Sequence, residues 1–511
     1  MPPFPLDPGG RRLPLERGYA LRAPGLAGEG ALFFPTPGSA PVRAAAPATP
    51  ELEEAFRRTD FREAVTLALD ARPTPPPPTV PALRSPEGED ALELEVPDLG
   101  PDRGQVVLAI AEDGALSWHF PVDPGGTGIE APTVRGSGGV RRFRIPREVV
   151  PPPSDPATHR GFVGTVGRKL LKVLVYPAMD PVLGTIGRHF AGRWEARNRP
   201  YRIREFLPDT YTLPEAPELA GSDWERLARG RALLFIHGTF STSWGAFQQI
   251  PRALMEELHR EYQGRVIAFD TYTLSQDPAE NARWFLDQIP EGLRLEADVI
   301  CHSRGGLVAR GLGLLGSEGR RTEGRVGLRR VVFVGVPNGG TVLADPAHMV
   351  QILDRMSSAM VLLPSGPVTE VMEAVLVAVK VLGHGVVNGL PGLASMHPDG
   401  PFLQRLNGAP PGGLEGYAVT ADFEPIRKGL RSLLTGGAAG ALADRIFQGE
   451  PNDLVVSTEG VHSAGNAGDF PLPPERVLRF PPEEGVVHTS YFGAPETSEA
   501  LRRWLIHGRG P

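Results

Sequence analysis

From about residue 231 onward, short apolar runs alternate with helix-like segments, and this alternation most limits how the chain can fold. The runs cover residues 232–236, 266–269, 297–300, 330–336, 417–420 and 477–480, and stretches with helical periodicity include 250–262, 281–288 and 305–315. Strands buried on both faces read as continuous apolar runs, and their alternation with helices favours a parallel sheet covered on both sides. We therefore expect a mostly parallel, doubly wound α/β fold here.

The segment 299–306, V-I-C-H-S-R-G-G, reads as a buried strand that ends in a serine on a sharp turn before a helix. A serine forced into a strained conformation between strand and helix projects its oxygen into a cleft. Gly305 and Gly306 relieve the crowding on the helix side. Cys301 stands where the usual G-x-S-x-G pattern has glycine, and we interpret it as a small buried residue that the turn tolerates, because a buried thiol away from positive charge is inert. Ser303 is the candidate nucleophile.

Acyl transfer through a serine also needs amide donors for the oxyanion. One is expected from the backbone of Arg304, directly after the nucleophile. The other is expected from the loop after the first apolar run, F-I-H-G-T-F-S, where Gly238 allows a turn that aims the amide of Thr239, or less favourably of Phe240, into the cleft. His237 precedes the serine at a strand end, so we expect it to shape the loop.

A carboxylate must orient the base, and three aspartates follow expected strands of the sheet. Asp453 lies in P-N-D-L-V-V, immediately before a short apolar stretch that would anchor it, and it comes nearest before the histidine-containing region. Asp422 is the alternative, and Asp345 is the least favoured. A solvated turn aspartate is the competing structural interpretation for each.

Three histidines lie downstream of Asp453. His488 falls in the loop between the last expected strand and a terminal helix over 496–506, which gives the order Ser, Asp, His. His462 is the less favoured alternative for the general base. His507 ends the terminal helix, where a surface histidine facing the helix dipole is ordinary.

The segment from about 231 to 508 resembles the α/β-hydrolase lipases and esterases, and bacterial lipases in particular. The resemblance rests on H-G-T-F at 237–240, H-S-R-G-G at 302–306, V-P-N-G-G-T at 336–341, N-D at 452–453 and His488. It implies an α/β-hydrolase fold. In that family the Pro-x-x-Gly-Thr/Ser stretch leads into a cap, which implies a helical lid insertion over 342–406.

The expected lid carries five of the chain's eight methionines, which are Met349, Met356, Met360, Met372 and Met396. Flexible thioethers suit an adaptable apolar surface such as an acyl-chain site. Phe240, Met349 and Met356 are therefore candidate substrate-binding residues. Packing inside ordinary helices is at least as good an explanation for each methionine taken singly.

Proline clusters at 73–78 and 150–156 suggest where the chain divides. We expect an irregular Pro-rich segment over 1–90 and a small β-rich module over 91–150, where short stretches alternate with period two. A helical linker region packed on the catalytic domain follows over 157–220. The α/β-hydrolase domain then occupies 221–511, with the lid insertion inside it.

Composition limits the partners and the compartment. The net charge of −7, from 53 basic and 60 acidic residues, gives no overall attraction to nucleic acid. The basic stretch 161–200 makes peripheral membrane contact possible, but glycine and proline interrupt any amphipathic face, so we expect packed helices instead. A single cysteine, no signal-like start and no uninterrupted apolar run of membrane-spanning length favour the cytoplasm. No motif calls for a metal or cofactor.

These residues and the resemblance lead us to expect hydrolysis of a small-molecule or lipid carboxylic ester, through an acyl-enzyme on Ser303 with His488 and Asp453. The same triad would serve an acyltransferase or an amidase. A non-catalytic protein of the same fold, whose N-terminal region binds a partner, is the alternative from another class.

Overall fold

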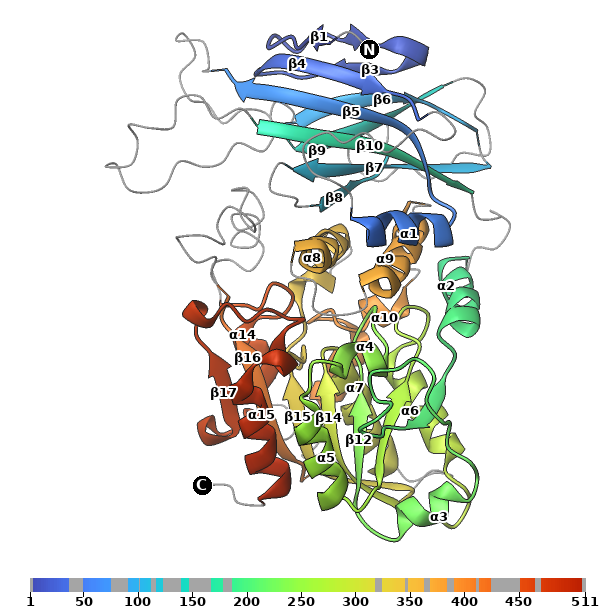
Figure 1. Cartoon of the computed structure of the whole chain (residues 1–511), viewed down its shortest axis with the longest axis vertical. Coiled ribbons are helices and arrows are strands. Elements are labelled where there is room, and N and C mark those ends of the chain that lie inside the picture. Colours follow the sequence, from blue (N-terminus) through green and yellow to red (C-terminus); the bar gives the residue numbers. More distant parts are fainter. Residues whose placement is uncertain are drawn as a thin grey trace.

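The computed structural model of the protein describes residues 3–35, 49–74, 91–100, 102–111, 116–122, 139–146, 167–177, 186–317, 324–344, 348–362, 368–383, 390–409, 413–423, 451–464 and 470–507. These residues form an N-terminal β module and a mostly parallel α/β sheet with helices on both faces (Figure 1). A group of helices lies between the module and the sheet.

The α/β sheet follows the alternation of apolar runs and helices. Its strands lie in the order β11 (Arg202–Glu205), β13 (Val266–Asp270), β12 (Ala232–Ile236), β14 (Leu295–His302), β15 (Val326–Val334), β16 (Glu415–Ala421) and β17 (Val477–Phe480). Every neighbouring pair is parallel except β11 with β13. The strands expected from the apolar runs are confirmed. Strand β11 was not expected, because its sequence R-I-R-E is short and charged, as suits an edge strand.

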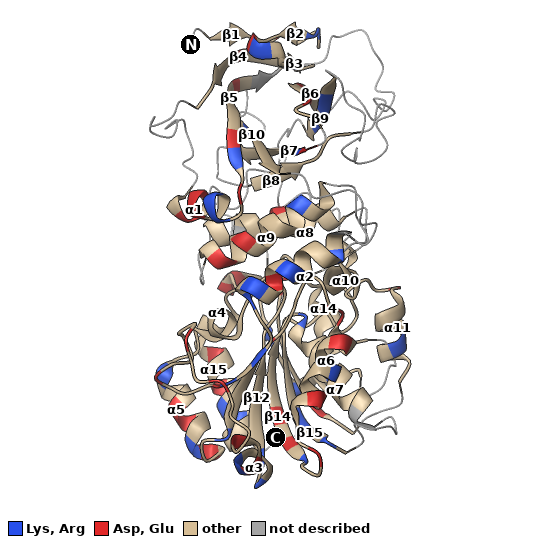
Figure 2. Cartoon of the chain, turned by 90° about the vertical axis from the view of Figure 1, so that its right-hand side faces the viewer, with Lys and Arg blue, Asp and Glu red and all other residues tan. Residues whose placement is uncertain are grey.

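Side chains of successive strand residues enter two different cores. Along β12, Leu234 and Ile236 pack into the core on one face, while Leu233 and Phe235 pack into the core on the other. The first face is covered by α3 (Asp223–Ala228), α6 (Pro278–Gln288) and α7 (Gly305–Ser317). The second is covered by α5 (Arg252–Glu261), α15 (Pro495–Leu501) and the π-helical turn η7 (Arg502–Ile506). Figure 2 shows charged residues along outer helices such as α3, α5 and α6, as expected for a doubly wound sheet with two buried faces.

The N-terminal module is a sandwich of two antiparallel sheets. One has the order β1 (Phe4–Pro5), β4 (Leu26–Phe33), β5 (Arg62–Pro73), β10 (Gly167–Pro177), β7 (Arg103–Ala111) and β8 (Leu116–His119), and the other has the order β2 (Leu13–Pro14), β3 (Ala20–Arg22), β6 (Ala91–Pro97) and β9 (Val140–Pro146). Leu67 and Val107 of the first sheet share a buried core with Leu94 and Phe143 of the second. This core holds the two sheets together.

The expected division of the N-terminal half needs correction. Residues 1–90 are not irregular in their described part, because β4 and β5 pair with each other and β5 also pairs with β10. The segment 157–220 is not purely helical either, since it contributes strands β10 and β11 as well as helix α2 (Ile186–Asn198). The α/β sheet thus begins before residue 221. These strands pair with partners far away in the sequence, which local periodicity cannot reveal.

The insertion expected over 342–406 is helical where it is described. It contains α8 (Met349–Leu362), α9 (Val368–Leu382), α10 (Pro391–Ala394) and α11 (Pro401–Asn407). Helix α8 contacts β8, and α9 packs against α1 (Pro50–Arg58) and α2, so both helices lie between the module and the α/β sheet (Figure 1). Among the described helices, none combines the length and apolarity needed to cross a bilayer.

Candidate active site

Ser303 occupies the sharp turn between β14 and α7. Its φ is 52°, a left-handed conformation that is strained for a residue with a side chain, and its backbone N–H donates to the carbonyl of Val334 at 2.9 Å. Close backbone approach explains the glycines nearby. A Cβ at Gly238 would lie 2.5 Å from the Cβ of Ser303, and one at Gly305 would collide with the carbonyl oxygen of Ile236. Only glycines allow the turn to lie this close to the end of β12.

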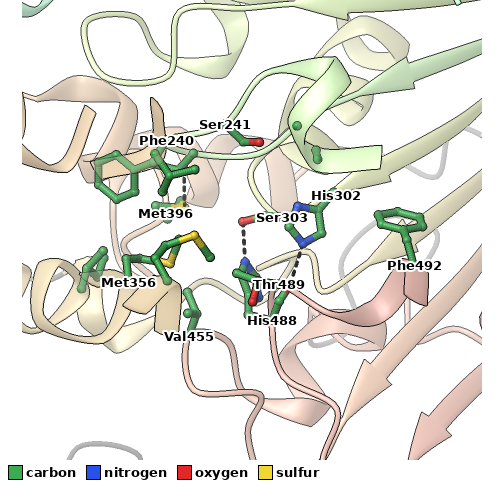
Figure 3. Close-up of a pocket in the computed structure, with 16 residues that line it drawn as sticks. Phe240, Ser241, His302, Ser303, Met356, Met396, Val455, His488, Thr489 and Phe492 are labelled. Atoms are coloured by element: carbon green, nitrogen blue, oxygen red, sulfur yellow. Dashed lines mark hydrogen bonds between the residues drawn. The ribbon is translucent and has the colours of Figure 1, made fainter. Parts of the chain in front are cut away.

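The structure brings Ser303, His488 and Asp453 together. Figure 3 shows the contact between Ser303 and His488. His488 Nε2 lies 2.9 Å from Ser303 Oγ, and His488 Nδ1 lies 2.8 Å from Asp453 Oδ2. A hydrogen bond from the backbone N–H of His488 to the carbonyl of Asp453, 3.0 Å long, ties the two loops together. The three side chains come from the carboxyl edge of a parallel sheet, where loops from separate strands meet.

The carboxylate of Asp453 is buried and fully engaged. Its Oδ1 accepts the amides of Val455 at 3.0 Å and Val456 at 2.8 Å. Burial by itself would raise the pKa of Asp453, but His488 and these amides favour the ionised form and hold that pKa below its ordinary value. The carboxylate is therefore ionised at neutral pH, as is required to orient an imidazole.

Sequence reasoning missed Tyr491, whose hydroxyl donates to Asp453 Oδ2 at 2.8 Å. Burial and the neighbouring Asp453 raise the pKa of Tyr491, so it remains a neutral donor. Its position three residues after His488 was the only signal that could have suggested this contact.

The alternative acids and bases lie elsewhere or are otherwise engaged. Asp422 forms an ion pair with Arg479 at 3.1 Å, and His462 lies 3.4 Å from Glu459. His507 ends the terminal helix, and Asp345 lies outside the described residues. None of the described alternatives forms a hydrogen bond with Ser303 or His488.

Two histidines beside the turn have contacts of their own. His237 accepts the backbone N–H of Thr271 through Nε2 at 3.0 Å, which fits its expected role in shaping the loop. His302 Nε2 lies 2.8 Å from the carbonyl oxygen of His488, and burial, followed by the charge of His488, lowers the pKa of His302 to about 3. A neutral His302 therefore supports the backbone of His488.

Cys301, the residue that departs from the usual pattern at the turn, is fully buried. Burial raises the pKa of its thiol, which donates to the carbonyl of Val332, so its surroundings are those of a packed, unreactive side chain.

The expected oxyanion donors lie in two short loops beside Ser303. Phe240 has a φ of 61°, so the loop after β12 turns sharply there. Within the described residues, the backbone N–H groups of Thr239, Phe240 and Arg304 donate to no protein oxygen. The Arg304 side chain binds elsewhere, because its guanidinium donates to the carbonyl of Gly392 at 2.9 Å and to Asn281 Oδ1 at 3.0 Å. Its backbone amide is left as a potential donor.

A cavity with about 720 Å³ of empty space, part of it open to solvent, lies over Ser303 (Figure 3). Apolar side chains dominate its lining, and no Asp, Glu, Lys or Arg is among the described residues that line it. The apolar members are Phe240, Ala246, Ile352, Met356, Met360, Val371, Met396, Val455 and Phe492. Of the expected substrate-binding residues, Phe240 and Met356 line this cavity. Met349, at the start of α8, is buried in the core and is not among the residues that line the cavity.

Residues 198–506, more than half of the chain, match the family model described as "Domain of unknown function (DUF7379)", so the chain belongs to this family. A search of curated proteins finds no match.

Several solved structures are similar at low identity. Lipase 1 from Pelosinus fermentans is 12% identical, with a TM-score of 0.38, over 54% of this chain and 98% of that one. Phospholipase PlaB from Legionella pneumophila is 15% identical, with a TM-score of 0.29, over 45% of each chain. A structure from a study of carboxylesterases of Nitrososphaera gargenis is 13% identical, with a TM-score of 0.29, over 54% of this chain and 90% of that one. These similarities are remote in both sequence identity and TM-score.

Gly335 lies against the contact between Asp453 and His488. It follows β15 with a φ of 55°, and a Cβ there would lie 3.2 Å from Asp453 Oδ2, 3.3 Å from His488 Nδ1 and 2.8 Å from Tyr491 Cε2. Gly335→Ala should therefore displace the contact between Asp453 and His488. We expect kcat for an ester substrate to fall by about 100-fold.

Gly264→Ala is the matched control, because Gly264 also has a positive φ, 75°, but a Cβ there meets nothing within 4 Å. It carries a similar backbone strain far from Ser303. Equal activity of the two variants, at equal folded fraction by circular dichroism, would contradict the prediction.

Proposed function

We propose that the chain is a serine hydrolase of the α/β-hydrolase superfamily that cleaves carboxylic esters. The observation that carries this proposal is the continuous set of contacts from Ser303 Oγ through His488 to Asp453, with distances of 2.9 and 2.8 Å. The nucleophile, base and orienting carboxylate of acyl transfer would each be present within hydrogen-bond reach.

In the proposed acylation step, Ser303 Oγ attacks the ester carbonyl carbon while its proton moves to His488 Nε2. The negative charge that develops on the carbonyl oxygen is held by the backbone amides of Thr239 and Arg304. Collapse of the tetrahedral intermediate breaks the ester C–O bond, and His488 gives its proton to the departing alcohol. Asp453, ionised and fixed by backbone amides, stabilises the imidazolium.

Deacylation repeats these roles with water as the nucleophile. His488 Nε2 takes a proton from water, the resulting hydroxide attacks the acyl carbon, and Ser303 leaves with the proton that His488 returns. The products are a carboxylic acid and the free enzyme. An alcohol or amine acting in place of water would make the same site a transferase.

The cavity over Ser303 points to an apolar acyl group in the substrate. Its described lining has no charged side chain, and three methionines, Met356, Met360 and Met396, contribute flexible thioethers. Burying a charge on the acyl chain without a partner would be costly. The acid part of the ester is therefore proposed to be neutral, as in a small aliphatic or lipid ester.

The nucleophile is tested by labelling with a fluorophosphonate probe. The native protein should react covalently, and Ser303→Ala should neither react nor hydrolyse p-nitrophenyl butyrate, with kcat reduced by at least about a thousandfold. Labelling that persists in Ser303→Ala would remove Ser303 as nucleophile. An unreactive but folded native protein would favour the non-catalytic alternative.

The acyl site is tested by the chain-length preference. Met356→Trp fills the cavity, so kcat/KM for p-nitrophenyl octanoate, relative to the acetate, should fall on the order of tenfold, since each methylene contributes to binding in an apolar pocket. Met356→Leu conserves volume and should keep the native preference. An unchanged octanoate-to-acetate ratio in Met356→Trp would place the acyl chain elsewhere.

We also propose that α8 and α9 form a lid over this site and that the N-terminal module holds the lid in place. Along α8, Ile352, Met356 and Met360 recur every four residues and line the cavity. Another side of α8 binds β8: the indole N–H of Trp118 donates to Ser357 Oγ at 3.0 Å, and the backbone N–H of Leu116 donates to Ser358 Oγ at 2.9 Å.

Helix α9 is attached to the module in a similar way. Lys380 donates to the carbonyl of Thr59, and Arg58 forms an ion pair with Glu373 at 3.2 Å. Val371 of the same helix lines the cavity. These contacts support a lid whose inner surface meets substrate while its outer surface is bound to the N-terminal module.

The attachment is tested by removing hydroxyls from α8. The double variant Ser357→Ala, Ser358→Ala loses the hydrogen bonds from the Trp118 indole and from the Leu116 backbone N–H. Amide hydrogen exchange in α8 should therefore rise at least about tenfold. Exchange in β12 and β14 should not change, which serves as the internal control. Native-like protection of α8 in this variant would show that the module does not hold the lid through these contacts.

A further inference from the structure

Arg199 lies one residue after α2, outside the set of residues that line the cavity, yet its guanidinium bonds to both walls of the proposed site. Nη1 donates to the carbonyl of Phe240 at 2.7 Å and to that of Ser241 at 3.3 Å, and Nη2 donates to the carbonyl of Glu370. The side chain thus joins the loop after β12 to helix α9.

The burial of this cation is unusual. Arg199 is 9% exposed, and among the described residues no carboxylate forms an ion pair with it. Instead, its acceptors among the described residues are three backbone carbonyls, and the centroid of the Trp194 ring lies 5.1 Å from its guanidinium carbon. A buried charge without hydrogen bonds is strongly unfavourable, so these carbonyls are held firmly toward Arg199.

The position of the two loop carbonyls matters for the expected oxyanion donors. Because a peptide unit is planar, fixing the carbonyls of Phe240 and Ser241 fixes the two peptide planes that follow Phe240. Phe240 itself has the left-handed φ of 61°. Holding the planes after it maintains this turn, and therefore the direction of the Phe240 amide, which shares the Cα of Phe240 with the first of these planes. The Thr239 amide lies one peptide unit earlier in the same turn.

The other anchors of this loop act at its two ends. At the start, His237 accepts the amide of Thr271, and at the far end the amide of Ser243 donates to Asp270 Oδ1 at 2.7 Å. Between these ends, Arg199 holds the carbonyls of Phe240 and Ser241 from a separate helix.

The other nitrogen of the Arg199 guanidinium, Nη2, contacts helix α9 of the proposed lid. Glu370 directly precedes Val371, which lines the cavity. One turn earlier in the chain, Glu195 accepts the amides of Thr273, Leu274 and Ser275 at distances of 2.6 to 3.0 Å. The carboxyl end of α2 therefore fixes two loops beside the site, and Arg199 is the member that also contacts α9.

We propose that Arg199 is a positioning residue for the proposed ester hydrolysis. It fixes the conformation of the loop after β12, which carries the proposed oxyanion donors, through the carbonyls of Phe240 and Ser241. It couples that loop to the proposed lid through the carbonyl of Glu370. This inference rests on the proposed function, since it concerns the same amides and the same cavity. Arg199 itself does not touch the substrate.

The test compares Arg199→Met with Arg199→Lys and the native protein. In Arg199→Met we expect kcat for p-nitrophenyl butyrate to fall about 10- to 100-fold while KM changes less than about threefold, because oxyanion stabilisation acts mainly in the transition state. Inhibition by an alkyl trifluoromethyl ketone, which forms an anionic adduct with the serine, should weaken by a similar factor. Inhibition by a neutral alkyl alcohol should not change. Arg199→Lys keeps one donor group and should recover part of the loss.

Arg188→Met is the matched control, because Arg188 lies on the same helix but is exposed and binds Gln276 and Glu280. Its kcat and inhibitor affinities should be native. Native kcat and native affinity for the ketone in Arg199→Met would overturn the proposal. Equal loss of affinity for the ketone inhibitor and for the alcohol inhibitor would also overturn it, because it would indicate a merely structural role. If Arg199→Met does not fold, the same comparison in Arg199→Lys decides. Absence of Ser303-dependent esterase activity in the native protein would instead refute the proposed function.

Discussion

The left-handed turn at Ser303 is the constraint on which the rest of the site depends. A residue with a side chain adopts a φ of 52° only where its surroundings enforce it, and here β14, α7 and the end of β12 meet with almost no space between them. Gly238 and Gly305 are required by that contact, since any Cβ would collide. The turn fixes Ser303 Oγ at the carboxyl edge of the sheet, and the loops that carry Asp453 and His488 arrive at the same edge.

Polar groups at the site are held chiefly by backbone atoms. Asp453 accepts two amides, His302 contacts the carbonyl of His488, and Arg199 binds carbonyls of the loop after β12. Backbone partners are rigid because they belong to packed strands and tight turns, so the fold itself holds the geometry of these side chains. The described residues that line the cavity carry no charged side chain, so an apolar group could occupy it without burying a charge.

The helices between the module and the sheet connect the two halves of the chain. Helix α8 presents Met356 toward the cavity and Ser357 toward β8, so neighbouring residues serve different surfaces. This arrangement gives the N-terminal module a physical means of affecting the cavity. Sequence patterns could not indicate it. Strands β5 and β10 were hidden because they pair across roughly a hundred residues, and pairing of that range leaves no local periodicity beyond that of a buried segment.

The sequence by itself determined the alternation of strands and helices in the C-terminal part, the turn at Ser303 and the chain order of the candidate residues, because each depends on local pattern and backbone sterics. Only the tertiary structure decided which aspartate meets His488 and that Met356 rather than Met349 faces the cavity. It alone also decided that Tyr491 contacts Asp453 and that Arg199 contacts the loop after β12. Those choices depend on how distant segments pack, and a contact between residues far apart in the chain leaves no mark on the pattern around either of them.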